Sequence, residues 1–142
     1  MRIYLSVPMI ANRAPTVALA MARAIGDAGH TVTSPWVLGP VEAHNPGVLN
    51  IFSRDMRGAE ESDAIVADVS SPSTGVGMEL MAAYKARRKI IVVAREGSTM
   101  SRMLLHMDGK ETVDFRDEQD LYAKLFRLLA PASPERTAAN QK

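Results

Sequence analysis

The sequence has no cysteine, few aromatic residues and almost no net charge, and each shortage excludes a class of function. Without Cys among its 142 residues, the chain lacks disulfides, thiolate catalysis and Cys-ligated zinc or iron–sulfur sites. Its 17 basic and 16 acidic residues leave a net charge of +1, which argues against binding a nucleic-acid polymer or a membrane surface through charge. No apolar run reaches the ~20 residues that a membrane span needs.

The remaining absences concern metals and targeting. His30, His44 and His106 lie far apart in the sequence and form no metal-ligand spacing, so no metal is expected. Residues 1–8 are too short and too β-prone for a signal peptide. We therefore expect a cytoplasmic protein without a metal or organic cofactor, whose chemistry depends on hydroxyls, carboxylates and amides.

What is present is a regular alternation of strand and helix patterns in one domain, residues 1–130, followed by a polar tail at 131–142 that we expect to be disordered. The 34–47 segment, rich in Pro and Gly, predicts a long loop of the kind that often binds a ligand. Apolar spacing and turn signals predict strands at 3–7, 31–33, 63–69, 89–94 and 112–115, and helices at 14–28, 48–62, from the turn 70–77 to about 87, 98–107 and 118–129.

This alternation predicts an α/β fold, a flavodoxin- or Rossmann-like three-layer sandwich with helices on both faces of a parallel sheet. Five strands at this length suit the order 2-1-3-4-5. In that order the binding crevice lies at the carboxyl ends of the first and third strands, where the winding reverses. The loop after the first strand and the turn after the third are expected to meet there.

The turn Ser73-Thr74-Gly75-Val76-Gly77 opens a helix and is a candidate phosphate cradle. Its glycines allow close approach of the backbone, and free N–H groups at a helix start attract anions. It follows neither the dinucleotide fingerprint nor a Walker loop. The alternative is an ordinary strand-to-helix turn with a Ser or Thr N-cap, which the turn alone favours.

Two carboxylates are candidates for catalysis. Glu79 lies one turn into the helix beside the crevice, where the positive helix end is expected to keep it ionised, although a dipole-complementing Glu is a common alternative. Asp55 falls within the apolar stripe Val48, Ile51, Phe52, Met56 and Ala59, which is unfavourable unless the carboxylate is paired. It could deliver a proton, or it could pair with Arg54, Arg13 or a backbone amide.

Residues 63–80, with the core Pro-Ser-x-Gly-Val-Gly-x-Glu, resemble the signature of the 2'-deoxynucleoside 5'-monophosphate N-glycosidases, within the nucleoside 2-deoxyribosyltransferase-like superfamily. The order of elements from Ile3-Tyr4-Leu5-Ser6 onward is similar as well. The resemblance implies an N-glycosidase that acts on a nucleotide substrate. Several residues of this chain match the family's functional positions.

By resemblance, Glu79 is the nucleophile and Asp55, in its Arg-Asp-Met context, is the acid on the preceding helix. The remaining matches are substrate-binding positions: Tyr4 on the first strand, Ser73, Gly75 and Gly77 in the motif, and Ser101, which the resemblance places in the phosphate site of a neighbouring subunit of a homodimer. A retaining glycosidase needs two such acids roughly 5 Å apart, so the residue types fit the chemistry independently.

The sequence departs from the family after the first strand. Where members carry a Gly-Ser-Ile-Arg-like segment that holds phosphate, this chain has Pro8 and Ile10, leaving Asn12 or Arg13 as replacements. The turn at 70–73 lacks the Asp-rich pattern of the transferases, which favours hydrolysis. Hydrolysis of nucleoside 5'-monophosphates is thus the expected activity, with base exchange by a deoxyribosyltransferase or a non-catalytic nucleotide-binding module as alternatives.

Overall fold

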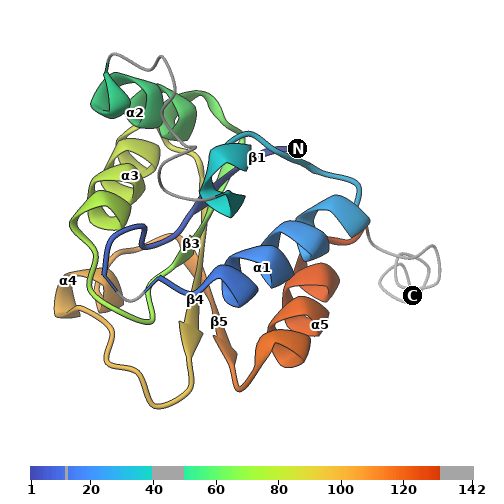
Figure 1. Ribbon diagram of the computed structural model, residues 1–142. Coiled ribbons are helices and arrows are strands. Elements are labelled where there is room, and N and C mark those ends of the chain that lie inside the picture. Colours follow the sequence, from blue (N-terminus) through green and yellow to red (C-terminus); the bar gives the residue numbers. More distant parts are fainter. Residues whose placement is uncertain (12, 40–49, 132–142) are drawn as a thin grey trace, which may run out of the picture.

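The computed structural model describes residues 1–11, 13–39 and 50–131 (Figure 1). Much of the predicted loop at 34–47 and nearly all of the predicted tail lie outside these residues. The elements in chain order are β1 (Arg2–Ser6), α1 (Pro15–Asp27), β2 (Thr31–Val32), the 3-10 helix η1 (Pro35–Leu38), α2 (Ile51–Glu61), β3 (Ala64–Asp68), α3 (Thr74–Lys85), β4 (Lys89–Arg95), α4 (Arg102–Leu105), β5 (Lys110–Phe115) and α5 (Glu118–Leu129).

The five strands form one parallel sheet in the order β2-β1-β3-β4-β5, which confirms the predicted topology. β3 is buried along its whole length, as its unbroken apolar pattern predicts for a strand covered on both faces. This order leaves β1 and β3 adjacent, with the chain winding outward from them in both directions. The switch point of the sheet therefore lies between the carboxyl ends of β1 and β3.

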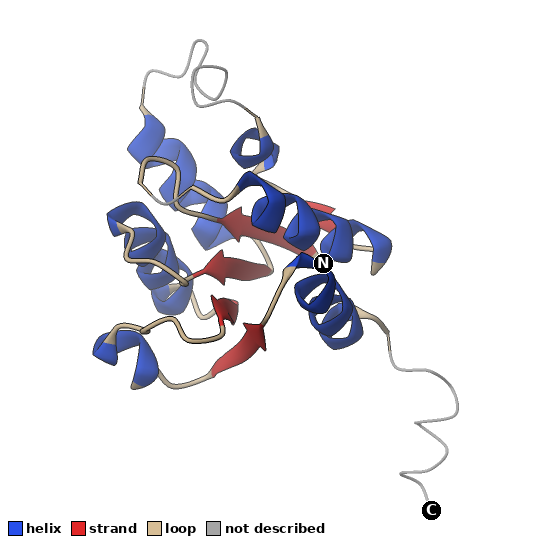
Figure 2. Ribbon diagram, turned by 60° about the horizontal axis from the view of Figure 1, so that its bottom comes forward, coloured by secondary structure: helices blue, strands red, loops and turns tan. Residues whose placement is uncertain are grey.

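Helices cover the sheet on both sides, and strand alternation divides the core into two layers (Figure 2). Ile3 and Leu5 of β1 face α1 and α5, in a layer completed by aliphatic residues of both helices. Tyr4, one residue out of phase, belongs to the other layer, beneath α2 and α3. Ser6 follows Tyr4 by two positions and shares its face of the strand.

Several boundaries differ from the sequence expectations. The helix expected at 98–107 is confined to Arg102–Leu105, because a turn in which Ser98 donates to the Arg95 carbonyl precedes it. The last strand begins at Lys110 rather than at 112, paired along its length with β4. The methionines around this helix differ in their surroundings: Met100 and Met107 pack against the α2–α3 layer, whereas Met103 is 80% exposed.

Candidate active site

A cavity of about 510 Å³ opens at the switch point of the sheet, and we call it the acid cavity. This volume lies within the range of small-molecule sites. It combines an apolar wall with two carboxylates, one arginine and the turn that starts α3. The lining residues are Tyr4, Val7, Met9, Ile10, Ala11, Trp36, Val37, Ile51, Arg54, Asp55, Pro72, Ser73, Thr74, Gly75, Val76 and Glu79.

Glu79 projects from α3 into this cavity, where the Tyr4 hydroxyl hydrogen-bonds its carboxyl group. The pKa of Glu79 is raised from its ordinary value of 4.5 to about 7, mainly by burial. The Tyr4 bond opposes this shift, and the nearby Asp55 charge adds to it. At neutral pH this pKa leaves Glu79 about half ionised, which is less than the full ionisation expected from the helix end. The dipole effect fades after the first helical turn, so desolvation dominates at this depth in α3.

Tyr4 occupies the floor of the cavity and is 1% exposed. Burial, followed by the adjacent Glu79 charge, raises the pKa of Tyr4, so its hydroxyl remains a hydrogen-bond donor. The ring packs against α2 at Gly58, where a Cβ atom would lie 2.7 Å from Tyr4 Cε2. A glycine at this point lets α2 approach β1 closely, and it brings Asp55, one turn earlier in α2, over the tyrosine.

Ser6 lies behind the same carboxylate. Its side chain is fully buried, and Oγ has no hydrogen-bond partner within the described residues. The Ser6 hydroxyl nevertheless lowers the pKa of Glu79, which places it close to that carboxyl. Sequence reasoning missed Ser6, although its two-residue spacing from Tyr4 on a strand was a signal that both side chains share one face.

Asp55 lines the opposite wall and is paired with its neighbour in the sequence. Arg54 Nε lies 2.7 Å from Asp55 Oδ1, and both side chains are about one-fifth exposed, at 20% and 21%. The guanidinium carbon of Arg54 lies 4.2 Å from the centre of the Trp36 ring, and Trp36 meets the Tyr4 ring edge-on at 6.3 Å. The pairing with Arg54 is one of the alternatives that the sequence left open.

The predicted apolar stripe on α2 is wrong in part. Ile51 and Phe52 are 45% and 58% exposed, and Ala59 is the fully buried member among the described positions. Val48 lies outside the described residues. Asp55 therefore faces a cavity rather than the core, because α2 spans the edge of the crevice with only its C-terminal half packed on the sheet.

The turn that starts α3 borders the acid cavity on its other side. Ser73 caps the helix, with its hydroxyl accepting a bond from the Val76 N–H at 3.4 Å, as the ordinary-turn interpretation predicts. Gly75 stands beside the nucleophile candidate: a Cβ atom there would lie 3.8 Å from Glu79 Oε1. Gly77 faces away from the acids, and a Cβ atom on it would meet nothing within 4 Å.

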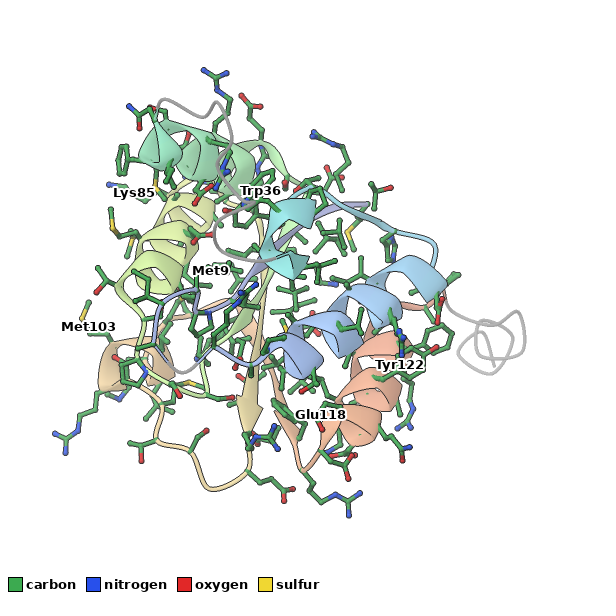
Figure 3. The ribbon with its side chains drawn as sticks, viewed as in Figure 1. Met9, Trp36, Lys85, Met103, Glu118 and Tyr122 are labelled. Carbon is green, nitrogen blue, oxygen red and sulfur yellow. The ribbon has the colours of Figure 1, made fainter. Side chains whose placement is uncertain are left out.

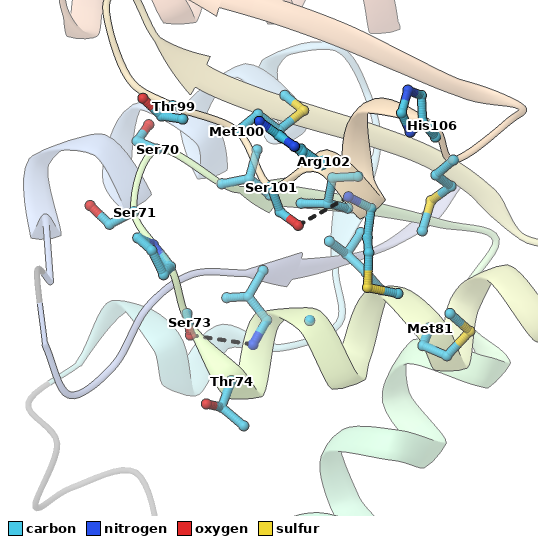
Figure 4. Close-up of a pocket in the computed structure, with 18 of the residues that line it drawn as sticks. Ser70, Ser71, Ser73, Thr74, Met81, Thr99, Met100, Ser101, Arg102 and His106 are labelled. Atoms are coloured by element: carbon cyan, nitrogen blue, oxygen red, sulfur yellow. Dashed lines mark hydrogen bonds between the residues drawn. The ribbon is translucent and has the colours of Figure 1, made fainter.

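Ser101 belongs to a different, larger cavity between α3 and α4, of about 1010 Å³ (Figure 4). Its hydroxyl accepts a bond from the Met103 N–H at 3.3 Å, and it lies across this cavity from Ser73. Ser73 and Thr74 line both cavities, so the turn separates them. Within a single chain, Ser101 is therefore not among the residues that line the acid cavity.

Arg13 is likewise outside the lining of the acid cavity, and its guanidinium donates to the carbonyls of Val37 and Gly39. Asn12 lies outside the described residues. Met9 and Trp36, from the segments after β1 and β2, are on the cavity side and well separated from Glu118 and Tyr122 on α5 (Figure 3). In the described part of the chain, no three His, Asp or Glu side chains are grouped to hold a metal ion.

No helix among the described residues is long and apolar enough to cross a membrane.

No family model matches the sequence. Two solved structures share its fold. A CMP N-glycosidase of Clostridium botulinum superposes with a TM-score of 0.63 and 18% identity, covering 88% of this chain and 98% of the other. A 2-deoxyribosyltransferase of Bacillus psychrosaccharolyticus gives 0.63 and 22% identity, covering 92% and 96%.

The sheet order and these likenesses define the chain as a protein of the nucleoside deoxyribosyltransferase-like α/β fold. A curated relative, the protein of Thermofilum pendens named 2'-deoxynucleoside 5'-phosphate N-hydrolase 1, is 32% identical over 136 residues, which cover 91% of this chain and 95% of the relative. The chain belongs to this N-hydrolase family, and thus to the glycosidases, as its motif at 63–80 indicated.

Proposed function

We propose that the chain hydrolyses the N-glycosidic bond of nucleoside 5'-monophosphates, releasing the free base and a ribose or deoxyribose 5-phosphate, with Glu79 as nucleophile. The observation that carries the proposal is the placement of Glu79, hydrogen-bonded by Tyr4, in one cavity with Asp55 at the switch point of the sheet. The relative of this chain in Thermofilum pendens is named for hydrolysis of 2'-deoxynucleoside 5'-phosphates, which supports the proposal.

In the first step, an ionised Glu79 oxygen attacks C1' of the sugar. Before the attack, the proton of the pair moves from Glu79 to Asp55. The C1'–N bond then breaks, its electron pair leaves with the base nitrogen, and the proton on Asp55 neutralises the departing base. Glu79 and the sugar are then joined through an ester bond at C1', as in retaining glycosidases. Tyr4 keeps the attacking carboxylate oriented through its hydrogen bond.

In the second step, water attacks C1' and the ester bond to Glu79 breaks. The proton that water loses passes to Asp55, which restores both carboxyl groups for the next turnover. A carboxyl with a pKa of about 7 is ionised in roughly half of the molecules at neutral pH, which is enough to start the reaction. In the second step Glu79 leaves C1' as a carboxylate.

The substrate phosphate is assigned to the turn at the start of α3. Ser73 and Gly75 line the same cavity as Glu79 and lie at the N-terminus of α3. The N-terminus of a helix of 12 residues favours an anion. The apolar wall formed by Met9, Ile10 and Trp36 suits the base. Sugar and phosphate then span the distance between the two walls, with C1' over Glu79.

A homodimer in which Ser101 reaches the partner's phosphate site completes the proposal. Ser101 lies in the α3–α4 cavity, away from the acids of its own chain, on a surface where Met81, Tyr84 and Met103 are 42%, 39% and 80% exposed. Flexible Met side chains are common on adaptable contact surfaces. A second copy of the chain would cover this surface and carry its Ser101 toward an adjoining cavity.

Mixed subunits test the dimer. Inactive Glu79→Gln protein combined with a Ser101→Ala variant should form heterodimers with one intact and one doubly defective site. Activity above the sum of the two parents after subunit exchange would support the shared site. Full activity of a monomer at nanomolar concentration would contradict it.

A chromatographic assay of base release tests the function. Nucleoside 5'-monophosphates with ribose and with deoxyribose, and the matching nucleosides, are each incubated with the protein. We expect free base and sugar 5-phosphate in equal amounts from the monophosphates. Addition of a second free base distinguishes base exchange, which would yield a new nucleotide. Stabilisation by nucleotide without any consumption would leave only a binding module.

A further inference from the structure

The strongest feature not used in the proposed chemistry is the way Arg54 is held. One edge of its guanidinium meets a carboxylate, with Nε 2.7 Å from Asp55 Oδ1. Its carbon lies 4.2 Å over the ring centre of Trp36, a cation–π distance. Arg54, Asp55 and Trp36 all line the acid cavity, so this arrangement forms part of the wall that a substrate meets.

Trp36 is itself fixed by the floor of the site. Its ring meets Tyr4 at an interplanar angle of 64°, and Tyr4 hydrogen-bonds Glu79. A continuous series of contacts therefore joins the two acids through Tyr4, Trp36 and Arg54. The charge of Arg54 also lowers the pKa of Glu79, so a single guanidinium acts on both carboxyl groups.

On the basis of the proposed function, we propose that Arg54 is a positioning residue: clamped on the Trp36 ring, it holds Asp55 by Oδ1 so that Oδ2 is presented to the leaving base. Because Arg54 engages Oδ1, Oδ2 is the oxygen that takes and delivers the proton in this proposal. Arginine suits this task because its planar head can stack and donate at once, which a lysine ammonium cannot do.

The proposal predicts a split between turnover and binding. Arg54→Met should lower kcat for base release by about 10- to 100-fold, since a small misplacement of a catalytic group has an effect of this order, while KM changes by no more than about threefold. Arg54→Lys keeps the charge without the stacked plane and should fall between Met and the parent. Trp36→Leu should lower kcat more than Trp36→Phe, which keeps a ring for stacking.

A double-mutant cycle tests whether Arg54 acts through Asp55. Once Asp55→Asn has removed the carboxylate, adding Arg54→Met should have a much smaller further effect on kcat, limited to the loss of the Arg54 charge near Glu79. Arg57→Met is the matched control on the same helix, because Arg57 pairs with Glu61 at exposed positions, 75% and 64% accessible. It should leave kcat unchanged. Thermal unfolding of each variant verifies folding, and Arg54→Lys replaces Arg54→Met if the latter fails to fold.

Equal losses from Arg54→Met with and without Asp55 would overturn the inference, as would a raised KM with unchanged kcat, which would assign Arg54 to substrate binding instead. If Asp55→Asn is slow while Arg54→Met is fully active, the inference fails and the proposed function stands. Parental turnover by Asp55→Asn would overturn the role of Asp55 and that of Arg54 with it.

Discussion

The two faces of the sheet are built for different purposes. The face under α1 and α5 is filled with apolar side chains, and the buried Ser34 near β1 has its hydroxyl satisfied by both the N–H and the carbonyl of Leu5, each at 2.8 Å. The face under α2 and α3 holds the buried Tyr4, an unpartnered Ser6 and the partly buried Glu79. Among the described residues, the buried hydroxyl without a hydrogen-bond partner and the carboxyl group with a strongly raised pKa thus both lie on the face that carries the acid cavity.

This contrast indicates a division between stability and chemistry within one small fold. An apolar layer stabilises the chain in proportion to the area it buries, and it does so without any requirement for a particular polar geometry. A buried carboxyl group destabilises the native state, and it persists here because the other layer supplies the necessary stability. Substitutions on the α1–α5 face should therefore mainly lower stability, whereas substitutions in the acid cavity should mainly lower activity.

The largest expected effect is on activity. Glu79→Gln should lower the rate of base release by at least about 10⁴-fold, the order seen when a covalent nucleophile is removed, because an amide of equal size cannot attack C1'. Chromatographic base release measures the rate, and circular dichroism verifies the fold. A variant that retains near-parental turnover would contradict the assignment of Glu79.

Asp55→Asn should be the next most damaging change. Loss of proton delivery lowers rates by roughly 10²- to 10⁴-fold. The loss should be smaller for a nucleotide analogue whose base leaves easily, because that base needs less help from a proton. Comparison of kcat on good and poor leaving groups checks this prediction. Equal losses on both would indicate a structural role.

On the opposite face, Leu121→Ala should change stability instead of catalysis. Leu121 is fully buried in the layer between α1 and α5, and truncation of such a side chain destabilises by about 2–5 kcal/mol. Chemical denaturation should show this loss, while kcat of the folded fraction stays within about twofold of the parent. A large fall in kcat would show that the two faces are coupled.

The ionisation of Glu79 should make the α2–α3 face weaken as pH rises. Because burial raises its pKa from 4.5 to about 7, the native state binds more protons than the unfolded chain in that interval. The free energy of unfolding should then fall between about pH 4.5 and 7 and level off above it. Glu79→Gln removes this slope and should be more stable than the parent at pH 8, by at most on the order of 3 kcal/mol. Denaturation of both proteins across pH provides the test, and parallel curves would contradict it.

The smallest effect concerns the pH profile and compares two of the buried serines, Ser6 and Ser34. We expect kcat/KM to rise with pH through about 7, as the Glu79 nucleophile ionises. Ser6→Ala removes a hydroxyl that lowers the pKa of Glu79, so this rise should move to higher pH by a few tenths of a unit. Ser34→Ala is the matched control: it should reduce stability, because it leaves the Leu5 backbone groups unpaired, without moving the profile. Identical profiles for Ser6→Ala and the parent would remove Ser6 from the site.

Several features of the fold and site could be predicted from local patterns. The strand order followed from alternating strand and helix signals, since handed crossovers leave few arrangements for five parallel strands. The candidates Tyr4, Asp55 and Glu79 were identified from a motif and from their positions, and all three line one cavity. The start of α3 at Thr74, capped by Ser73, depends only on neighbouring residues.

The predictions that the structure did not bear out concern properties that depend on residues distant in the sequence. Helical spacing placed Asp55 on an apolar stripe, but Ile51 and Phe52 on that stripe are exposed, because the position of α2 over the crevice is set by its packing at Gly58 and Ala59. The position of Glu79 near a helix start suggested an ionised group, yet its surroundings come from β1 and α2.

The sequence by itself determined the elements, their order in the sheet and the edge at which a site must form, because hydrophobic period, caps and crossover handedness are local or topological properties. Only the tertiary structure decided the electrostatics of that site. Residues 4, 54, 55 and 79 share one cavity with Trp36, and the raised pKa of Glu79 reflects their burial and mutual charges. Desolvation and Coulomb interactions depend on distance in space, which the spacing of residues along the chain does not specify.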